Sequence, residues 1–463
     1  MGRLKAAFHT LGCKVNSYET EAMAELLKNA GYEIVPFAPG ADVYIINTCT
    51  VTAIADKRSR QMLHRAKEMN PGAVVCAVGC YAEDSAGLLK EDGSVDLIIG
   101  NAMKSSLPDI LAAHFDGSAV KPENYPVASV KEYDGLSIST TEDRTRASIK
   151  IQDGCNQFCT YCMIPYVRGR VRSRKEEEVI AEAARLAAEG FREVVLTGIH
   201  ISSYGLDFDY QGENRQTPLA SEAESNSRLI RLIEKTAAIP GIRRVRLGSL
   251  EPGIVTPGFI NALSEIPEFC PHFHLSLQSG SDTVLSRMNR RYRRDDYRSI
   301  CKLIRSRFPD AAITTDIITG FPGETDAEFE ETMQFAEEIG FSRIHVFKYS
   351  RRKGTKAADF PGQVPERIKK ERSDRLISLG RTLSVRYAER FLGRETEVLF
   401  EEETGTKGEF RGCTREYVEV LAASQENLRG SIRTSVISKI CPDGSAVGTA
   451  SSEKTIEYQA DTE

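Results

Sequence analysis

The sequence predicts an α/β protein with an N-terminal open parallel α/β domain, a central incomplete barrel of six βα units and a small C-terminal all-β barrel. Two stretches of apolar strands alternating with periodic helices favour parallel sheets that helices cover. Close to the C-terminus this alternation gives way to short strands between Gly and polar turns, which is typical of a small all-β unit.

The N-terminal domain is expected over residues 1–120. Its strands are predicted at 6–11, 43–47, 74–78 and 96–99, with helices at 17–30 and 53–69. In an open parallel sheet the carboxyl ends of the strands share one edge, where ligands bind. Residues 121–145 are rich in Pro, Ser, Thr and charge without an apolar period, which predicts a linker.

The central domain is expected over residues 146–380. Strand patterns lie at 147–152, 193–197, 244–247, 272–277, 312–318 and 343–349, and helical patterns such as 176–189 and 327–339 separate them. Six right-handed βα units form an incomplete barrel whose chemistry takes place at the carboxyl ends of the strands. The polar stretch 207–227 predicts an insertion in a loop.

A charged amphipathic helix at 366–390 leads into the third unit, expected over 383–452. Its strands are predicted at 395–400, 417–421, 433–440 and 446–450. These strands are short and are separated by Gly and polar turns, which indicates a small barrel.

The net charge of -5 does not mark a chain that is basic throughout. Nucleic-acid binding therefore depends on local runs at 168–175, 287–294 and 351–353, which are equally typical of solvated faces. No apolar run approaches the ~18 residues of a membrane span, and no secretory signal is recognisable. A cytoplasmic protein without membrane contact is expected.

The chain has 11 cysteines, and without an export signal they are expected to stay reduced. Cys155, Cys159 and Cys162 lie in GCNQFCTYC, directly after a predicted strand. Three thiolates in one loop can bind a four-iron cluster and leave one iron open for the amino and carboxylate groups of S-adenosylmethionine (SAM). The alternatives are a zinc site, for which a fourth ligand is missing locally, and unrelated core thiols.

A second trio, Cys13, Cys49 and Cys80, follows three strands of the N-terminal domain. These strand ends share one edge of the sheet, so the thiols can converge there and again leave one iron open. Three buried free thiols are the alternative. The other cysteines are predicted to be structural: Cys76, Cys270, Cys301, Cys413 and Cys441.

The spacing of the Cys155 loop, with Tyr161 beside its last cysteine, resembles the signature of the radical SAM superfamily. That resemblance implies SAM contacts after the later strands, although a Gly in these places is also typical of a plain turn. The implied residues are Tyr161, Thr197 and Gly198 of LTGIH, Ser276 and Gln278 of SLQSGS, and Asp316, Gly320 and Gly323 of DIITGFPGET. Glycine lets the backbone approach the adenine closely.

The whole chain resembles the radical SAM methylthiotransferases, which end in an RNA-binding TRAM barrel. The phrases TLGCKVN, NTCTVT, GRVRSR, LGSLEP and KYSRRKGT look most like the branch that acts on N6-threonylcarbamoyladenosine in tRNA. Other branches act on isopentenyladenosine or on a ribosomal protein aspartate, and these remain alternatives, as does a zinc-dependent RNA-binding protein.

The resemblance implies that Cys13, Cys49 and Cys80 bind an auxiliary [4Fe-4S] cluster and that Cys155, Cys159 and Cys162 bind the cluster that cleaves SAM. One SAM methylates the sulfur, and a second yields the radical that attacks C2 of the adenine at position 37. C2–H is neither acidic nor electrophilic, so the cofactors supply the chemistry. The implied partners are a tRNA anticodon stem-loop and an electron donor of the flavodoxin or ferredoxin type, and no DNA.

Arginine binds phosphate and stacks on bases, which makes two sets of residues candidates for RNA contact. They are Arg168, Arg170, Arg172 and Arg174 after the Cys155 loop, and Arg411, Arg415, Arg433 and Tyr417 in the C-terminal barrel. Asn16, Tyr18 and Asn47 flank the auxiliary site and could orient cluster or substrate. Ordinary surface or turn roles are the alternative for all of them.

Overall fold

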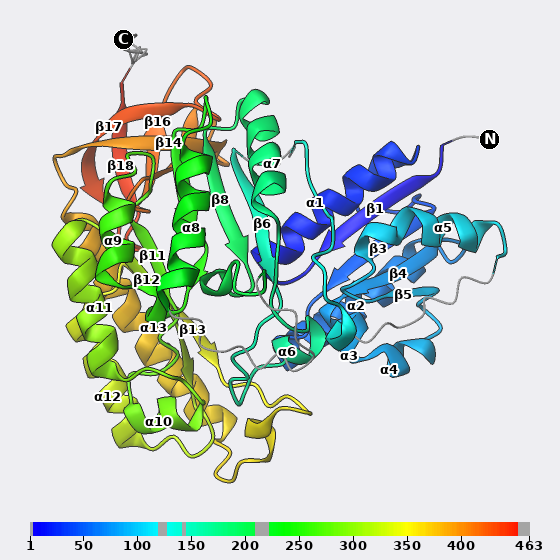
Figure 1. The fold of residues 1–463 in the computed structure, drawn as a ribbon, viewed down its shortest axis with the longest axis horizontal. Helices are drawn as coiled ribbons and strands as arrows, with labels where there is room; N and C mark the ends of the chain where they lie inside the picture. Colours follow the sequence, from blue (N-terminus) through cyan, green and yellow to red (C-terminus); the bar gives the residue numbers. More distant parts are fainter. Residues whose placement is uncertain (1–2, 119–126, 141–144, 209–221, 452–463) are drawn as a thin grey trace.

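The computed structural model describes residues 3–118, 127–140, 145–208 and 222–451. Three units follow one another along the chain (Figure 1): a five-stranded sheet, a partial barrel made of two four-stranded sheets, and a closed β-barrel. The predicted fold class is therefore confirmed.

The N-terminal sheet is parallel and has the strand order β2-β1-β3-β4-β5. Its strands are β1 (Lys5–Thr10), β2 (Glu33–Val35), β3 (Val43–Thr48), β4 (Val74–Gly79) and β5 (Leu97–Ile99). The sequence analysis missed β2. This edge strand has only three residues and none of them is buried, so no apolar run marks it.

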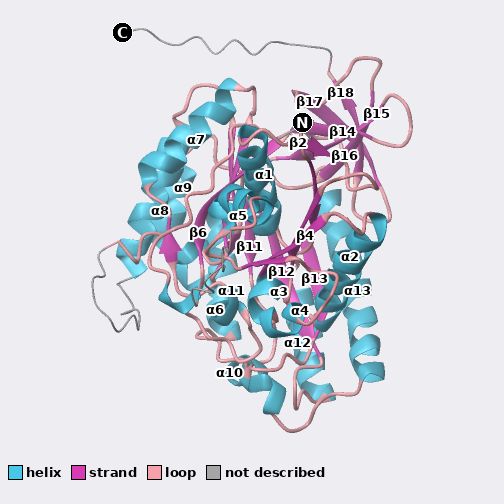
Figure 2. Ribbon diagram, turned by 90° about the vertical axis from the view of Figure 1, so that its right-hand side faces the viewer, coloured by secondary structure: helices cyan, strands magenta, loops and turns pink. Residues whose placement is uncertain are grey.

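Helices cover both faces of this sheet (Figure 2). The helices α1 (Lys14–Asn29) and α5 (Leu107–Phe115) pack on one face, and α2 (Ala53–Met69) packs on the other. Two short helices, α3 (Cys80–Asp84) and α4 (Ala86–Lys90), follow β4. Cys76 lies in the apolar core beneath α1 and α5 and is fully buried, in agreement with the structural role predicted for it.

The central unit contains the six predicted parallel strands. They are β6 (Arg146–Asp153), β8 (Glu193–Gly198), β9 (Arg244–Leu247), β11 (His272–Leu275), β12 (Ala312–Thr319) and β13 (Arg343–Lys348). Two short strands complete the sheets β7-β6-β8-β9 and β10-β11-β12-β13, namely β7 (Arg172–Ser173) and β10 (Ser249–Leu250). A parallel bridge between Val245 and Phe269 joins the two sheets.

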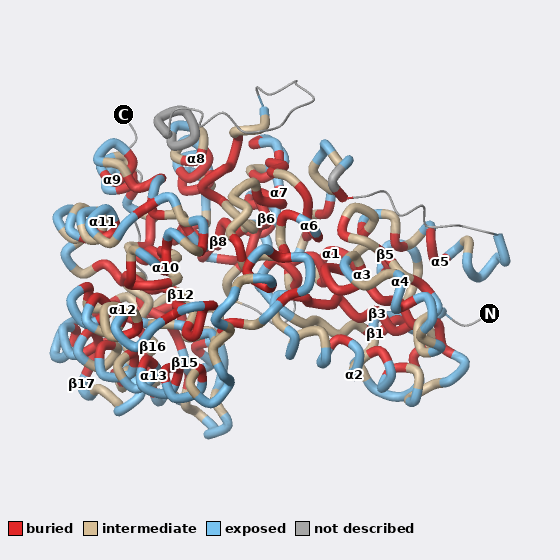
Figure 3. The backbone as a smooth tube through the Cα atoms, turned by 90° about the horizontal axis from the view of Figure 1, so that it is seen from below, coloured by how far each residue is buried: buried red, intermediate tan, exposed pale blue. Residues whose placement is uncertain are grey.

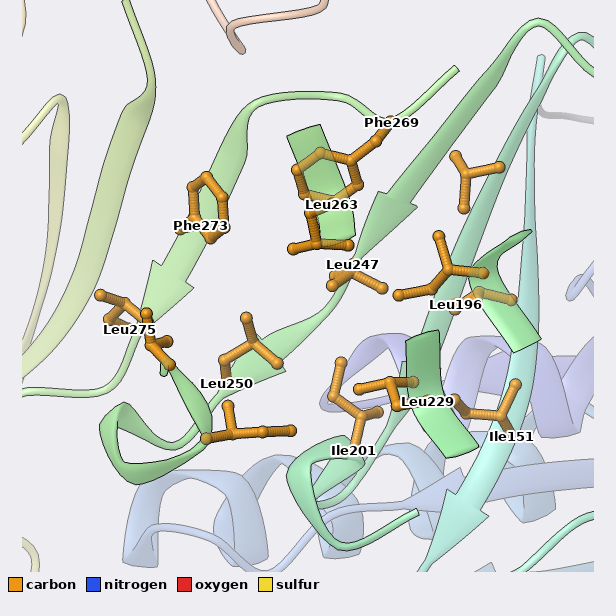
Figure 4. Close-up of a cluster of buried hydrophobic side chains, with 14 of the residues drawn as sticks. Ile151, Leu196, Ile201, Leu229, Leu247, Leu250, Leu263, Phe269, Phe273 and Leu275 are labelled. Carbon is orange, nitrogen blue, oxygen red and sulfur yellow. The ribbon is translucent and has the colours of Figure 1, made fainter. Parts of the chain in front are cut away.

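Helices form the outer layer of this unit, with their outer faces exposed and most of the strands buried (Figure 3), although β13 has no buried residue. They are α7 (Glu176–Ala188), α8 (Glu222–Ala237), α9 (Pro257–Ser264), α10 (Asp282–Arg287), α11 (Arg294–Arg307), α12 (Asp326–Ile339) and α13 (Glu366–Glu389). Leu196, Leu247 and Phe273 of the strands belong to one apolar core with Leu229 of α8 and Leu263 of α9 (Figure 4).

Two predicted irregular stretches differ from expectation. The predicted insertion at 207–227 is helical from Glu222, where α8 begins, and residues 209–221 lie outside the described residues. In the predicted linker, Leu136 and Ile138 are buried in the central core. The Tyr18 hydroxyl of α1 donates a hydrogen bond to the Leu136 carbonyl at 2.9 Å, so this stretch packs between the first two units.

The C-terminal barrel closes in the order β14-β15-β16-β18-β17. Its strands are β14 (Glu395–Glu403), β15 (Glu409–Thr414), β16 (Glu419–Ala423), β17 (Ile432–Ile440) and β18 (Ala446–Ala450). The sequence analysis missed β15 (EFRGCT), in which polar residues and a Gly hide the apolar alternation.

The turn between β15 and β16 packs against the beginning of the central strands. Tyr417 stacks on His272, with ring centroids 4.0 Å apart, and Arg246 donates hydrogen bonds to the carbonyls of Thr414 and Arg415 at 3.2 and 3.1 Å. The barrel therefore lies at the amino ends of the central strands, opposite the end from which the Cys155 loop leaves β6 (Figure 1).

Candidate active site at two cysteine trios

The Cys155 loop is fixed by its own backbone and by the segment after α10. Gly154 has φ +70°, and a Cβ there would lie 1.9 Å from the Arg170 carbonyl oxygen, so only glycine fits. The Thr160 amide donates to the Met288 carbonyl at 3.1 Å, and the Asn289 side chain donates to the Phe158 carbonyl at 3.2 Å. These contacts hold the loop in one shape at the end of β6.

The three thiols of this loop lie close enough to influence one another. Burial raises the pKa of Cys155 to about 12, and the neighbouring Cys159 thiol adds to the rise. Burial also raises the pKa of Cys162, with further contributions from Cys159 and Cys155. Arg290 donates a hydrogen bond from Nη1 to the Cys159 sulfur at 3.3 Å.

The residues predicted to contact SAM follow successive strands. Thr197 and Gly198 end β8, where a Cβ on Gly198 would lie 2.8 Å from the Gln152 carbonyl oxygen. Gln278 has φ +68°, and its amide donates to the Asp316 carbonyl at 2.8 Å, which brings these two residues together. The Ser276 carbonyl accepts a hydrogen bond from Tyr292 at 2.6 Å.

The two glycines after β12 approach other parts of the protein. A Cβ on Gly320 would lie 2.4 Å from Cγ of Lys369, and the Gly323 amide donates to the Gly362 carbonyl at 2.8 Å. Tyr161 lies edge-on to Phe321 in the same loop, with ring centroids 6.4 Å apart. This loop therefore lies against the Cys155 loop on one side and α13 on the other.

The second trio converges at the carboxyl edge of the N-terminal sheet. Cys13 precedes α1, Cys49 follows β3, and Cys80 begins α3 directly after β4. A Cβ on Gly12 would lie 2.9 Å from the Cys49 sulfur. Burial raises the pKa of Cys49 to about 11, and the nearby thiols of Cys80 and Cys13 contribute to the rise.

Across the described ranges, no group of three His, Cys, Asp or Glu side chains is arranged to hold a single metal ion. In a four-iron cluster each thiolate binds a different iron, so the sulfur atoms need not surround one point. The donor set of three thiols in each trio fits such a cluster.

Sequence analysis missed a buried charged cluster beside Cys80. Arg168 donates from Nε to the Cys80 sulfur at 3.3 Å and from Nη1 to Glu19 and Asp153 at 2.9 and 3.1 Å. Glu19 also pairs with Lys150, at 2.6 Å, and with Lys104. A signal was present only for Glu19, which interrupts the apolar face of a predicted helix, because Lys150 lies on the polar side of the alternating strand 147–152.

The prediction that Arg168, Arg172 and Arg174 contact RNA is wrong. Their exposed fractions are 0%, 2% and 3%. Arg172 lies 3.7 Å from the Asp153 carboxylate and Arg174 lies 2.6 Å from that of Glu182. A buried charge requires a buried partner, and internal carboxylates are the partners of these guanidinium groups.

Several other candidates have internal contacts as well. The Tyr417 ring is covered by His272, which contradicts a role in base stacking, and Arg415 donates to the Phe269 carbonyl at 2.9 Å. Tyr18 lies near Glu182, with its hydroxyl 3.1 Å from that carboxylate, and not at the cysteines. The remaining candidates have these contacts: Arg170 lies over Phe158, Arg411 pairs with Glu402, Arg433 lies near Glu426, Asn16 donates to the Thr48 carbonyl, and Asn47 donates to the Asn16 carbonyl.

The two trios meet at one junction. Cys80 packs with Met163 and Val167 in a small buried cluster, and Met163 directly follows Cys162. At the far edge of the partial barrel, Arg352 follows β13 and donates to the Thr50 hydroxyl at 2.6 Å, beside Cys49. The N-terminal unit therefore contacts the central unit in two places, after its first strand β6 and after its last strand β13.

This fold and this loop define a radical SAM domain. Residues 149–336 match the family model "Radical SAM superfamily", and residues 5–100 match "Uncharacterized protein family UPF0004". A solved structure of the radical S-adenosylmethionine methyltransferase TsrM from Kitasatospora setae is similar with a TM-score of 0.57 and 16% identity over 77% of each chain. At that identity the likeness concerns the fold alone.

Curated relatives define the family. The chain is 41% identical to "Threonylcarbamoyladenosine tRNA methylthiotransferase MtaB" of Bacillus subtilis (strain 168), over 92% of each chain. It is 37% identical to the protein of that name from Aquifex aeolicus (strain VF5), over 90% of this chain and 96% of the relative. It is 36% identical to "tRNA-2-methylthio-N(6)-dimethylallyladenosine synthase" of Pelotomaculum thermopropionicum, over 91% and 92%. The chain belongs to the radical SAM methylthiotransferase family.

The protein is accordingly a transferase. Within the part of the chain that the structure describes, no helix has the length and apolar character needed to cross a bilayer.

Proposed function

We propose that this enzyme adds a methylthio group to C2 of N6-threonylcarbamoyladenosine at position 37 of tRNA, using two [4Fe-4S] clusters and two molecules of SAM. The names of the relatives at 41% and 37% identity support the substrate. The observation that carries the two-cluster proposal is the junction itself, where Cys80 of one trio packs against Met163, the residue after the other trio.

In this proposal Cys155, Cys159 and Cys162 hold the cluster that binds SAM, and Cys13, Cys49 and Cys80 hold the auxiliary cluster. Three thiolates leave one of four irons without a protein ligand. When bound, the clusters and SAM supply one-electron cleavage of a C–S bond and the sulfur to be transferred. A flavodoxin or ferredoxin type of donor would provide the electrons.

The chain's own residues orient the ligands and cover part of the site. Cys49, Cys80 and Cys155 are buried, with exposed fractions of 7%, 3% and 9%, whereas Cys13 is exposed and Cys159 and Cys162 are half-buried. One arginine donates to a sulfur of each trio, Arg168 to Cys80 and Arg290 to Cys159, both at 3.3 Å. Covering part of the site limits side reactions of reactive sulfur and radical species with solvent.

For the RNA we propose a surface on α2, because several of the predicted arginines are buried. Lys57, Arg58 and Arg65 are exposed on this helix. The helix lies beside the auxiliary site, since its Ser59 hydroxyl donates to the Cys49 carbonyl at 3.1 Å. Val51 and Ile54 at its start are 54% and 61% exposed. Cations with exposed apolar side chains fit a single-stranded RNA loop.

The test is anaerobic turnover. Reconstituted protein is incubated with SAM, dithionite and tRNA that carries N6-threonylcarbamoyladenosine, and the digested nucleosides are analysed by mass spectrometry. We expect a methylthio mass gain that is lost in Cys159→Ala. Release of 5′-deoxyadenosine without a mass gain would reject this substrate and direct the search to another tRNA adenosine or to a ribosomal protein aspartate.

A further inference from the structure

The Arg168 side chain is completely buried and makes an unusual contact for a buried guanidinium. Its Nε donates to the Cys80 sulfur at 3.3 Å, while its two terminal nitrogens donate to oxygen atoms. This contact directs the positive charge of Arg168 at the Cys80 sulfur.

The guanidinium is fixed by residues of two elements, α1 and β6. Glu19 of α1 accepts from Nη1 at 2.9 Å, Asp153 of β6 accepts from Nη1 at 3.1 Å, and the Asn16 side chain accepts from Nη2 at 2.6 Å. Charge-assisted contacts in a water-free interior are strong and directional. Arg168 therefore has little freedom to turn Nε away from the sulfur.

Residues that contact Arg168 and Cys80 also link the two trios. Asp153, which holds Arg168, lies two positions before Cys155 along the chain. The Asn101 side chain approaches the Cys80 sulfur at 3.7 Å and donates to the Val167 carbonyl at 2.7 Å, next to Arg168. A shift of the Cys80 ligand is thereby coupled to the strand that carries the other trio.

We propose that Arg168 is the positioning residue of the auxiliary site, which fixes the orientation of the Cys80 side chain and raises the reduction potential of the cluster held by Cys13, Cys49 and Cys80. Hydrogen bonds to cluster sulfurs and nearby positive charge favour the reduced, more negative cluster. This inference rests on the proposed function, because it requires the second cluster.

The test isolates the auxiliary cluster. In full-length protein with Cys155, Cys159 and Cys162 replaced by Ala, we compare Arg168 with Arg168→Gln and Arg168→Lys. Arg290→Gln in the same background is the matched control, because Arg290 donates to Cys159 of the other trio. After anaerobic reconstitution, iron is counted and the reduction potential is measured by titration followed with electron paramagnetic resonance.

We expect a lower potential in Arg168→Gln, a smaller decrease in Arg168→Lys, which keeps the charge but has no Nε–H, and no change in Arg290→Gln. If Arg168→Gln binds iron and its reduction potential is unchanged, the role given to Arg168 is wrong, although the proposed auxiliary cluster is retained. If Arg168→Gln does not fold, an unchanged potential in Arg168→Lys overturns it. Absence of iron in the background that retains Arg168 would instead reject the second cluster, and with it both proposals.

Discussion

At Gly154 the backbone leaves no space for a side chain, because the Arg170 carbonyl oxygen occupies the place of a Cβ at 1.9 Å. We predict that Gly154→Ala lowers the free energy of unfolding by about 3 kcal/mol, since a positive φ and a backbone clash add together. Urea denaturation measures this. Gly323→Ala is the control, because its φ is also positive, at +74°, and a Cβ there would meet nothing within 4 Å. The prediction fails if both variants lose the same stability.

Cys76 and Cys80 are close in sequence and have different surroundings, since only Cys80 lies at the edge of the sheet with Cys49. We predict that Cys80→Ala lowers the reconstituted iron content from about eight to about four per chain, because one four-iron cluster loses a ligand. Cys76→Ala should keep about eight. Equal iron in the two variants would contradict the assignment of Cys80.

At the scale of single elements, helix α2 carries the surface that we propose for RNA binding. We predict that Lys57→Glu with Arg58→Glu weakens tRNA binding and reduces the slope of log affinity against log salt by about 2, since each phosphate contact releases counterions. Lys302→Glu with Arg307→Glu, on the outer helix α11, makes the same change in charge at exposed positions. Filter binding at several salt concentrations compares them, and equal loss in both would indicate only a general effect of net charge.

The elements also differ in how well the sequence predicted them. Buried strands such as β3 and β4 are continuous apolar runs, so their position follows from the sequence. The strands β2, β7, β10 and β15 were missed. They are short or polar, and they become strands because a neighbouring strand offers hydrogen bonds. Local sequence carries little of that information.

At the scale of the whole molecule, Glu19 joins the first two units through Lys104, Lys150 and Arg168. We predict that Glu19→Gln lowers the free energy of unfolding by about 3–5 kcal/mol, because it leaves three buried cations without this carboxylate. Chemical denaturation measures the loss. Glu25→Gln, on the same helix but at a half-buried position, should cost much less, and equal losses would contradict the role given to Glu19.

The same carboxylate predicts a dependence of stability on pH. Burial by itself would raise the pKa of Glu19. The positive charges of Arg168, Lys104 and Lys150 have the larger combined effect and hold this pKa well below its ordinary value of 4.5. A lowered folded-state pKa contributes stability above the unfolded value and loses it as pH falls through the folded value. Below about pH 4.5 the difference in stability between native protein and Glu19→Gln should therefore shrink. A constant difference down to acid pH would contradict this.

The sequence by itself determined the order of the three units, the main strands and the two cysteine trios, because apolar periodicity and the spacing of Cys155, Cys159 and Cys162 are local properties. Only the tertiary structure decided what the arginines after that loop do. Arg168 and Glu19 are 149 positions apart and meet where two units pack. Whether a charge is solvated or buried depends on the surface that covers it, and distant segments supply that surface only after folding.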